Sequence, residues 1–318
     1  MISDAVRHRF ETLARSGDAD PAPLARAARQ GDTAAALDLA ALFARVGFIE
    51  PALIRDCYDA AANGWFGDAS PPLKLTAGEG DASPALWAPF WDFLDDETKM
   101  DPGSFTVRTA GLGDHVDSGF AERAGRASLD YPGVPDAVAQ GWPERFQLSD
   151  LAACPKGSLG AEFHSLIVDN KFDLEVLDRD ALGLANLRPP LDYLNVRILQ
   201  CHDLWHIIGG YHTTALHEVG ISAFQLSQFG HNYSAQFLAF ITARAALKQP
   251  QGAVGLLLEI ILSGWRHGRR SPQLLGVDWP NVWAQPTDDI RKNLGVAPYQ
   301  SPFPPDLVEQ MERATATA

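Results

Sequence analysis

Three residues of types that often bind metal ions lie close together in the segment Q-C-H-D-L-W-H, at His202, Asp203 and His206. An α-helix turns by about 100° per residue, so relative to His202 the side chain of Asp203 lies at about 100° and that of His206 at about 40°. All three therefore fit on one helix face. Histidines four residues apart let two imidazoles converge on one divalent ion. Asp203 is then either a further ligand or an acceptor for a histidine N–H.

A carboxylate that can complete this site follows after a turn. Gly209-Gly210 ends the helix, Thr213 or Thr214 can cap the next one, and Glu218 follows the second histidine after a gap of eleven residues. A helical hairpin brings the start of its second helix beside the end of its first, so we expect Glu218 to face the two histidines. Two histidines with one or two carboxylates suit a divalent metal, zinc before others, and leave a position for water or substrate.

The same region contains three more histidines, which we interpret as polar residues around the site and not as ligands: His212, His217 and His231. The segment H-D-L-W-H also resembles the H-E-x-x-H motif of zinc proteases. Asp203, however, is one carbon shorter than the glutamate base that this chemistry uses, so we do not expect a protease.

The elements that must position these residues are helices. Apolar residues recur at helical spacing between glycine, proline and asparagine, and no segment alternates as a β-strand does. Helices are expected at residues 23–29, 33–46, 51–62, 87–93, 157–170, 191–208, 214–229, 233–248, 252–264 and 288–294. The predicted fold class is therefore all-α, with a helical core built around a metal-binding helical hairpin and additional N-terminal helices.

The chain divides by pattern into four parts. Residues 1–105 form an N-terminal helical region of unknown role, and residues 106–150 are rich in turn signals and are expected to be an irregular linker or cover. Residues 151–300 form the helical metal-binding core, and residues 301–318 are a C-terminal tail.

Composition excludes several classes of protein. The 318 residues include 40 Asp plus Glu against 26 Lys plus Arg, a net charge of −14, so a nucleic-acid partner is not expected. A hydrophobic content of 46% is typical of a folded globular protein. The three cysteines form no C-x-x-C pair, which favours a reducing compartment and argues against a cysteine-built zinc site.

The N-terminus and the most apolar segment do not have the pattern of a signal peptide or of a membrane-spanning helix. The first residues lack the apolar stretch of a signal peptide, and the apolar run at residues 253–262 contains Glu259 and is too short to span a bilayer. We therefore expect a cytoplasmic protein, peripheral to the inner face of the membrane, with residues 235–265 apolar enough to lie against lipid.

Beyond these physical arguments, the sequence resembles the coenzyme Q biosynthesis protein 4 family of the ubiquinone pathway. The hallmark of that family, H-D-x-x-H followed by eleven residues and E, is matched here by His202, Asp203, His206 and Glu218. Supporting similarities are C-P-K-G-S-L-G-A-E-F from Cys154, an arginine five residues before the first histidine, G-W-R-H-G-R-R from Gly264 to Arg270 and R-K-N-L-G-V from Arg291. The likeness runs from Leu151 to roughly Val296 and leaves the N-terminal part unmatched. The chain departs from the family at His217, where glycine is usual, and at Ser222, where a basic residue is common.

The resemblance implies a function in ubiquinone synthesis. Members act on a polyprenylated hydroxybenzoate-type ring, with removal of the C1 carboxyl and hydroxylation of that carbon. A metal at the four hallmark residues would be the Lewis acid. Arg197, Arg269 and Arg270 are candidates for pairing with an anionic head group, and residues 233–248 and 252–264 for lining a groove for the prenyl tail.

Two other functions stay open. The protein could be a non-catalytic organiser that binds polyprenyl lipid and assembles other ubiquinone-biosynthesis proteins, with a structural metal; a homodimer is a further assembly to be tested. Alternatively, a metal-dependent phosphohydrolase of the His-Asp type would need His164 together with Asp278 or Asp288, and Glu218 would have no role in it.

Overall fold

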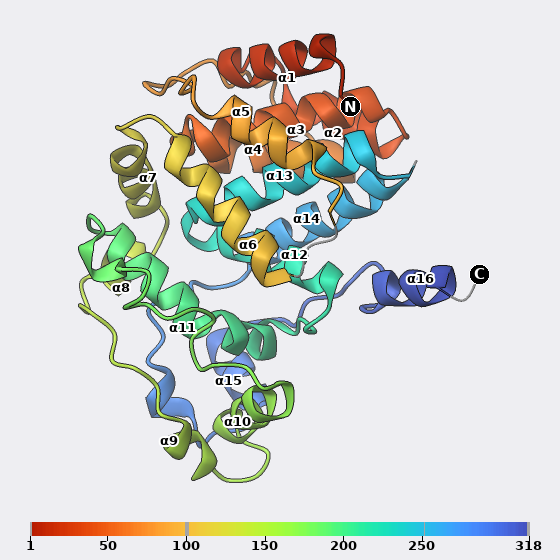
Figure 1. The fold of residues 1–318 in the computed structure, drawn as a ribbon. Coiled ribbons are helices and arrows are strands. Elements are labelled where there is room, and N and C mark those ends of the chain that lie inside the picture. The colour runs from red at the N-terminus through yellow and green to blue at the C-terminus, as the bar shows by residue number, and fades with distance from the viewer. Residues whose placement is uncertain (1, 99–101, 251, 317–318) are drawn as a thin grey trace.

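The computed structural model describes residues 2–98, 102–250 and 252–316 (Figure 1). This part of the chain is helical and contains no β-strand, which confirms the predicted all-α class. The N-terminal helices are α1 (Asp4–Ser16), α2 (Pro21–Arg29), α3 (Thr33–Phe48), α4 (Ile54–Phe66) and α5 (Trp87–Asp95). Next come α6 (Pro102–Gly111), α7 (Phe120–Leu129), α8 (Val134–Val138), α9 (Leu148–Ala152) and α10 (Leu159–Asn170). The remaining helices are α11 (Leu191–Gly209), α12 (Ala215–Phe229), α13 (Asn232–Lys248), α14 (Ala253–Arg270), α15 (Thr287–Leu294) and α16 (Leu307–Ala316). Short 3-10 turns lie at η1 (Pro51–Leu53), η2 (Leu112–His115), η3 (Leu184–Asn186) and η4 (Trp279–Val282).

Most expected helices lie where the apolar periodicity places them, but α14 continues past the predicted end at residue 264 to Arg270. The cause is the role of its glycines. A Cβ on Gly264 would lie 2.4 Å from the backbone oxygen of Gly220 on α12, and one on Gly268 would lie 1.8 Å from Ser227 Oγ. These glycines therefore allow α12 and α14 to pack closely, and they do not end the helix.

The N-terminal helices share one hydrophobic core with α13 and α14. The buried cluster runs from Phe10 on α1 through Phe43 and Tyr58 to Phe240 and Trp265. In Figure 1 the orange helices α3 and α4 lie beside the cyan and blue helices α13 and α14. The helices α13 and α14, expected to line a lipid groove, thus contribute buried side chains to this core. The sequence boundary at residue 105 is not a boundary of the core.

Two tryptophans connect α4 and α14 by hydrogen bonds across this core. Trp65 Nε1 donates to Glu259 at 2.7 Å, and Trp265 Nε1 donates to Asp59 at 2.8 Å. Glu259, the acid inside the most apolar segment of the chain, is therefore hydrogen-bonded where it meets α4.

A second buried cluster holds the lower part of the molecule in Figure 1 together, with α9, α10 and α15 around α11. It includes Phe163 of α10, Trp205 of α11 and Ile290 of α15. The stretch 106–150, expected to be an irregular linker or cover, contains the end of α6 and all of α7 and α8, and the expected C-terminal tail contains α16. Among the described residues, no helix is both long enough and apolar enough to cross a bilayer.

Candidate metal centre

The hallmark residues lie on two consecutive helices, α11 and α12, joined by a short turn. His202, Asp203 and His206 are in the last two turns of α11, and Glu218 is in the first turn of α12. The helix α11 ends at Gly210, which has φ +75°. This left-handed conformation suits glycine and reverses the chain within a short turn.

The ligand-type atoms of the two histidines and the glutamate lie close together, and each histidine Nε2 faces a different carboxylate oxygen of Glu218. His202 Nε2 lies 3.2 Å from Glu218 Oε2, His206 Nε2 lies 3.3 Å from Glu218 Oε1, and the two Nε2 atoms are 3.3 Å apart. Asp203 lies close by, because one of its carboxylate oxygens and the two histidine nitrogens fall within 4.8 Å of one another.

These distances match the donor set of a small divalent ion. Zinc lies about 2.0–2.1 Å from histidine nitrogen and about 2.0–2.2 Å from carboxylate oxygen, so neighbouring ligands in a tetrahedron are about 3.3–3.4 Å apart. The two histidine nitrogens, and each of them with one Glu218 oxygen, already lie close to this separation. The residues therefore fit a metal bound by two histidines and one carboxylate, and an Asp203 oxygen lies within 4.8 Å of both histidine nitrogens.

Burial and neighbouring charges shift the pKa values of the residues in the site. His206 is 1% exposed, whereas the Glu218 side chain is 44% exposed and forms the open side. Burial acts to raise the pKa of Glu218, but hydrogen bonds from His202 and His206 outweigh it, and the pKa falls well below the usual value. Burial acts to lower the pKa of His202, yet its contact with Glu218 raises that pKa. Burial together with the nearby Glu218 charge raises the pKa of Asp203, despite the two histidines.

Gln225 on α12 holds the other nitrogen of His202. The Gln225 side-chain amide nitrogen lies 2.8 Å from His202 Nδ1. An imidazole that binds a metal through Nε2 carries its proton on Nδ1, and the amide can present its oxygen to that proton by rotating its terminal bond. Gln225 is not among the residues predicted from the sequence, although it lies two helical turns after Glu218 on the same helix face.

The three other histidines surround the hairpin. His217 Nδ1 accepts the His212 backbone N–H at 2.7 Å, and burial with the neighbouring His212 lowers the pKa of His217 to about 4. His231 is the N-cap of α13 and bonds Ser234. None of the three side chains forms a hydrogen bond with His202, His206 or Glu218 in the part of the chain that the structure describes.

The arginines proposed for substrate binding have different surroundings. Arg197 is buried and donates to the backbone oxygens of Leu275 and Val277, so it holds the segment after α14. Arg269 pairs with Asp59 of α4. Arg270 is exposed, and its side chain forms no hydrogen bond or ion pair within the described ranges.

The residues required by the phosphohydrolase alternative do not join the cluster. His164 lies on α10. Asp278 accepts a hydrogen bond from Asn281, and Asp288 pairs with Arg291, both at the surface. Metal-type side chains grouped within the described residues include none of these three.

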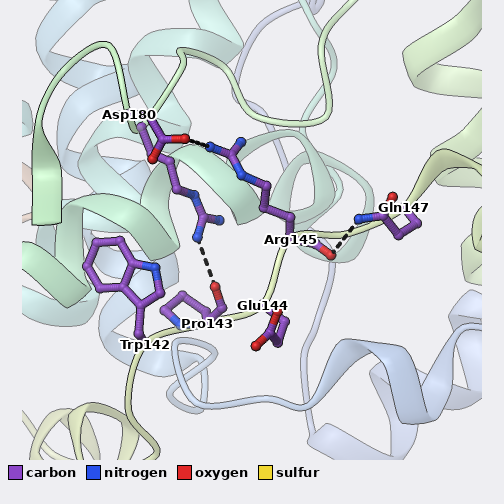
Figure 2. A pocket seen from close by; sticks show the side chains of 7 residues that line it. Trp142, Pro143, Glu144, Arg145, Gln147 and Asp180 are labelled. Carbon is purple, nitrogen blue, oxygen red and sulfur yellow. Dashed lines mark hydrogen bonds and ion pairs between the residues drawn. The ribbon is translucent and has the colours of Figure 1, made fainter.

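A separate pocket of about 330 Å³ lies before α9, beside the segment that leads to α11 (Figure 2). Arg145 there pairs with Asp180, and Arg179 donates to the Pro143 backbone oxygen, so both guanidinium groups already have partners. None of the predicted site residues lines it. Its lining consists of Trp142, Pro143, Glu144, Arg145, Gln147, Arg179 and Asp180.

Comparison with known proteins agrees with the resemblance in the sequence. The family described as coenzyme Q (ubiquinone) biosynthesis protein Coq4 matches residues 143–300. The ubiquinone biosynthesis protein COQ4 homolog, mitochondrial, of Rattus norvegicus is 29% identical over 151 residues, 48% of this chain and 55% of the relative. The COQ4 protein, mitochondrial, of Meyerozyma guilliermondii is 23% identical over 174 residues, 52% of this chain and 50% of the relative. The chain thus spans about half the length of the curated relatives it matches.

A solved structure extends the likeness to the fold. The crystal structure of a Nostoc punctiforme PCC 73102 protein, described as a candidate ubiquinone biosynthesis protein, superposes with a TM-score of 0.50 at 25% identity. The superposition covers 67% of this chain and 97% of the other. It therefore includes residues outside the range 143–300 that the family matches.

Proposed function

Because this chain belongs to the coenzyme Q (ubiquinone) biosynthesis protein Coq4 family, we propose that it acts in ubiquinone biosynthesis with one divalent metal ion, zinc before others, at His202, His206 and Glu218. Asp203 is the proposed fourth ligand. The observation that carries the proposal is the convergence of both histidine Nε2 atoms and the Glu218 carboxylate at 3.2–3.3 Å, which is close to the spacing of neighbouring ligands around a tetrahedral ion.

The proposed reaction is C1 decarboxylation with hydroxylation of a polyprenylated hydroxybenzoate-type ring. The carboxyl leaves as CO2 and an oxygen atom takes its place on carbon. This two-electron oxidation requires an oxidant such as O2, which is reduced to hydrogen peroxide as one water is consumed. A metal at this site supplies Lewis acidity toward a carboxylate or phenolate oxygen. The chain's own residues hold that ion on a buried histidine and leave an open side at the half-exposed Glu218, where a substrate oxygen can approach.

One observation favours the organiser as the second candidate. If the metal receives the phenolate oxygen, the carboxylate needs a cationic side chain, yet of the three candidate arginines Arg197 and Arg269 already bond protein groups and only the exposed Arg270 does not. If the protein is an organiser, the metal is structural and ubiquinone synthesis depends on the fold and not on the open coordination position.

Metal content tests the site first. We expect purified protein to carry about one zinc or similar ion per chain by elemental analysis, and His202→Ala or Glu218→Ala to lose it, because each removes one of the converging ligands. His164→Ala is the matched control and should keep the metal. Retention of metal in both ligand variants would remove the proposed site, and loss in the control would favour the phosphohydrolase.

Quinone-intermediate profiling tests the function. A deletion strain complemented with wild type should make ubiquinone, whereas Glu218→Ala should accumulate the prenylated ring that still carries its carboxyl. Metal-loaded wild-type protein should also convert a prenylated hydroxybenzoate in vitro when O2 is supplied. If it never does, while the strain still needs the protein for ubiquinone, the organiser function replaces the enzyme.

We also propose a peripheral contact with membrane lipid and a homodimer. Exposed apolar side chains support the first, since many of them lie in one stretch of the chain: Trp142, Leu148, Val168, Phe172, Val176, Leu177, Leu182 and Leu187. Flotation with neutral vesicles should be lost in the double variant Phe172→Ser and Leu182→Ser. Unchanged flotation of the variant would contradict a lipid contact through these side chains. The proposed homodimer is tested separately, by light scattering of the free protein.

A further inference from the structure

We propose that residues 297–309, which we call the C-terminal strap, position Glu218 for metal binding, and that Glu309 is the positioning residue within it. This inference rests on the proposed metal centre and adds a requirement that the hallmark motif does not contain. The family match ends at residue 300, so α16 with Glu309 lies beyond it. In Figure 1 the chain leaves α15 and runs to α16, which packs on α12.

The strap first holds the end of α11. The Tyr299 backbone N–H donates to the Gly209 oxygen at 2.7 Å, three residues after His206. Pro298 lies so close to Gly210 that a Cβ on that glycine would come within 2.8 Å of the proline side chain. The last turn of the helix that carries both histidines is therefore fixed by residues about ninety positions later in the sequence.

Aromatic side chains anchor the same part of the strap. The Tyr299 ring stacks on Tyr211 in the turn, with centroids 4.5 Å apart and planes at 18°. Tyr299 also shares a 2.6 Å hydrogen bond with Ser263, and His267 Nε2 donates to the Ala297 oxygen at 2.7 Å. Both of these partners lie on α14, so the strap ties the hairpin turn to the core helix behind it.

The strap then holds the start of α12. The sequence predicts Thr213 or Thr214 as the N-cap, but no side-chain cap bond forms at Thr214, whose hydroxyl donates to the Pro305 oxygen at 2.6 Å. Glu309 caps the helix instead, since its Oε1 accepts the Ala215 N–H at 2.9 Å. A carboxylate at a helix N-terminus is also favoured by the helix dipole.

The consequence concerns the distance between the two halves of the site. The histidines belong to α11 and Glu218 to the first turn of α12, so their 3.2–3.3 Å separations depend on how the two helix ends are held. The strap bonds both ends. A shift of α12 by even part of an ångström would separate Glu218 from the histidines and weaken metal binding.

Zinc titration of the full chain against a chromophoric chelator tests the proposal. Glu309→Ala should raise the zinc dissociation constant at least about tenfold, the usual effect of removing a group that orients ligands. Glu309→Gln keeps an acceptor for the Ala215 N–H and should stay close to wild type. The absorption spectrum of bound Co²⁺ should change with Glu309→Ala, because the ligand geometry changes.

The control removes a helix cap far from the metal. Asp32 caps α3 by accepting the Ala34 and Ala35 N–H groups, so Asp32→Ala costs comparable stability and should leave zinc affinity unchanged. If Glu309→Ala does not fold, Thr214→Val removes a second contact between the strap and the start of α12, the bond to the Pro305 oxygen, and should also weaken zinc binding.

The outcomes separate the two proposals. A wild-type protein that does not bind zinc contradicts the metal centre itself. A wild type that binds zinc, with Glu309→Ala and Thr214→Val binding equally well, overturns the strap. Equal loss of affinity in Asp32→Ala would also overturn it, since general stability would then explain the effect.

Discussion

Acid should destabilise the protein through one buried histidine, His231. The residue is 5% exposed, and its Nδ1 accepts the Ser234 N–H at the start of α13 while Nε2 lies 3.4 Å from Asn195 Oδ1. These bonds require the neutral ring. Burial, with the nearby His202, lowers the pKa of His231 to about 3.

The direction in which pH changes the stability follows from whether the folded or the unfolded state binds the proton. An unfolded histidine titrates near about 6.5, so below that pH the unfolded chain binds a proton that the folded chain refuses. The stabilising effect of His231 is fully present above pH of about 6.5 and is lost progressively down to a pH of about 3. At about 1.36 kcal/mol per pKa unit, the loss at pH 5.0 is about 2 kcal/mol. This is a large part of a typical stability of about 5–15 kcal/mol.

The measurement compares two proteins at two pH values. Urea unfolding of wild type and His231→Asn, followed by circular dichroism at pH 7.5 and 5.0 with a chelator present, isolates His231 because other groups contribute equally to both. Asparagine can still cap the helix but does not titrate. We expect wild type to lose about 2 kcal/mol more than the variant between the two pH values. An equal loss in the two proteins would refute the reasoning.

Three further predictions concern the metal site and its supports. Glu218→Gln should raise the zinc dissociation constant by about two orders of magnitude in a chelator competition, because four-ligand sites bind with about 10–16 kcal/mol, or about 3 kcal/mol per ligand; an unchanged constant would show that Glu218 is not a ligand. Arg197→Met should reduce the urea unfolding free energy by about 3 kcal/mol, since the buried oxygens of Leu275 and Val277 lose their donor, and a loss below about 1 kcal/mol would contradict this role. Gly210→Ala should cost about 1–2 kcal/mol for its positive φ and weaken zinc binding as well, and a variant that matches wild type in both would show that the turn is free to relax.

The two consecutive helices and the spacing of the four candidate residues on them were accessible from the sequence because their signals are local. A helix period, a pair of glycines and a fixed spacing place His202, His206 and Glu218 near one another without knowledge of the rest of the fold. The all-α class follows from the same periodicity and is confirmed. The ligand distances themselves come only from the structure, because helix spacing cannot fix them to a few tenths of an ångström.

What the sequence did not predict depends on contacts between distant segments. Thr214 looks like a cap by local rules, but a tertiary bond to Pro305 turns its hydroxyl away and Glu309 replaces it. Likewise, the apolar pattern of α13 and α14 cannot distinguish a surface that meets lipid from one that meets protein. The structure shows that helices more than 150 residues earlier in the chain cover them, with Phe43 of α3 and Phe240 of α13 in one buried cluster.

The order of synthesis delays formation of the shared core. Glu259, the hydrogen-bond acceptor of Trp65, is synthesised 194 residues later, and Trp265, the donor to Asp59, is synthesised 206 residues later. At about 5–20 residues per second, about ten seconds or more pass before the partners of Trp65 and Asp59 on α14 have been synthesised. The shared core can therefore be completed only after α14 has been synthesised.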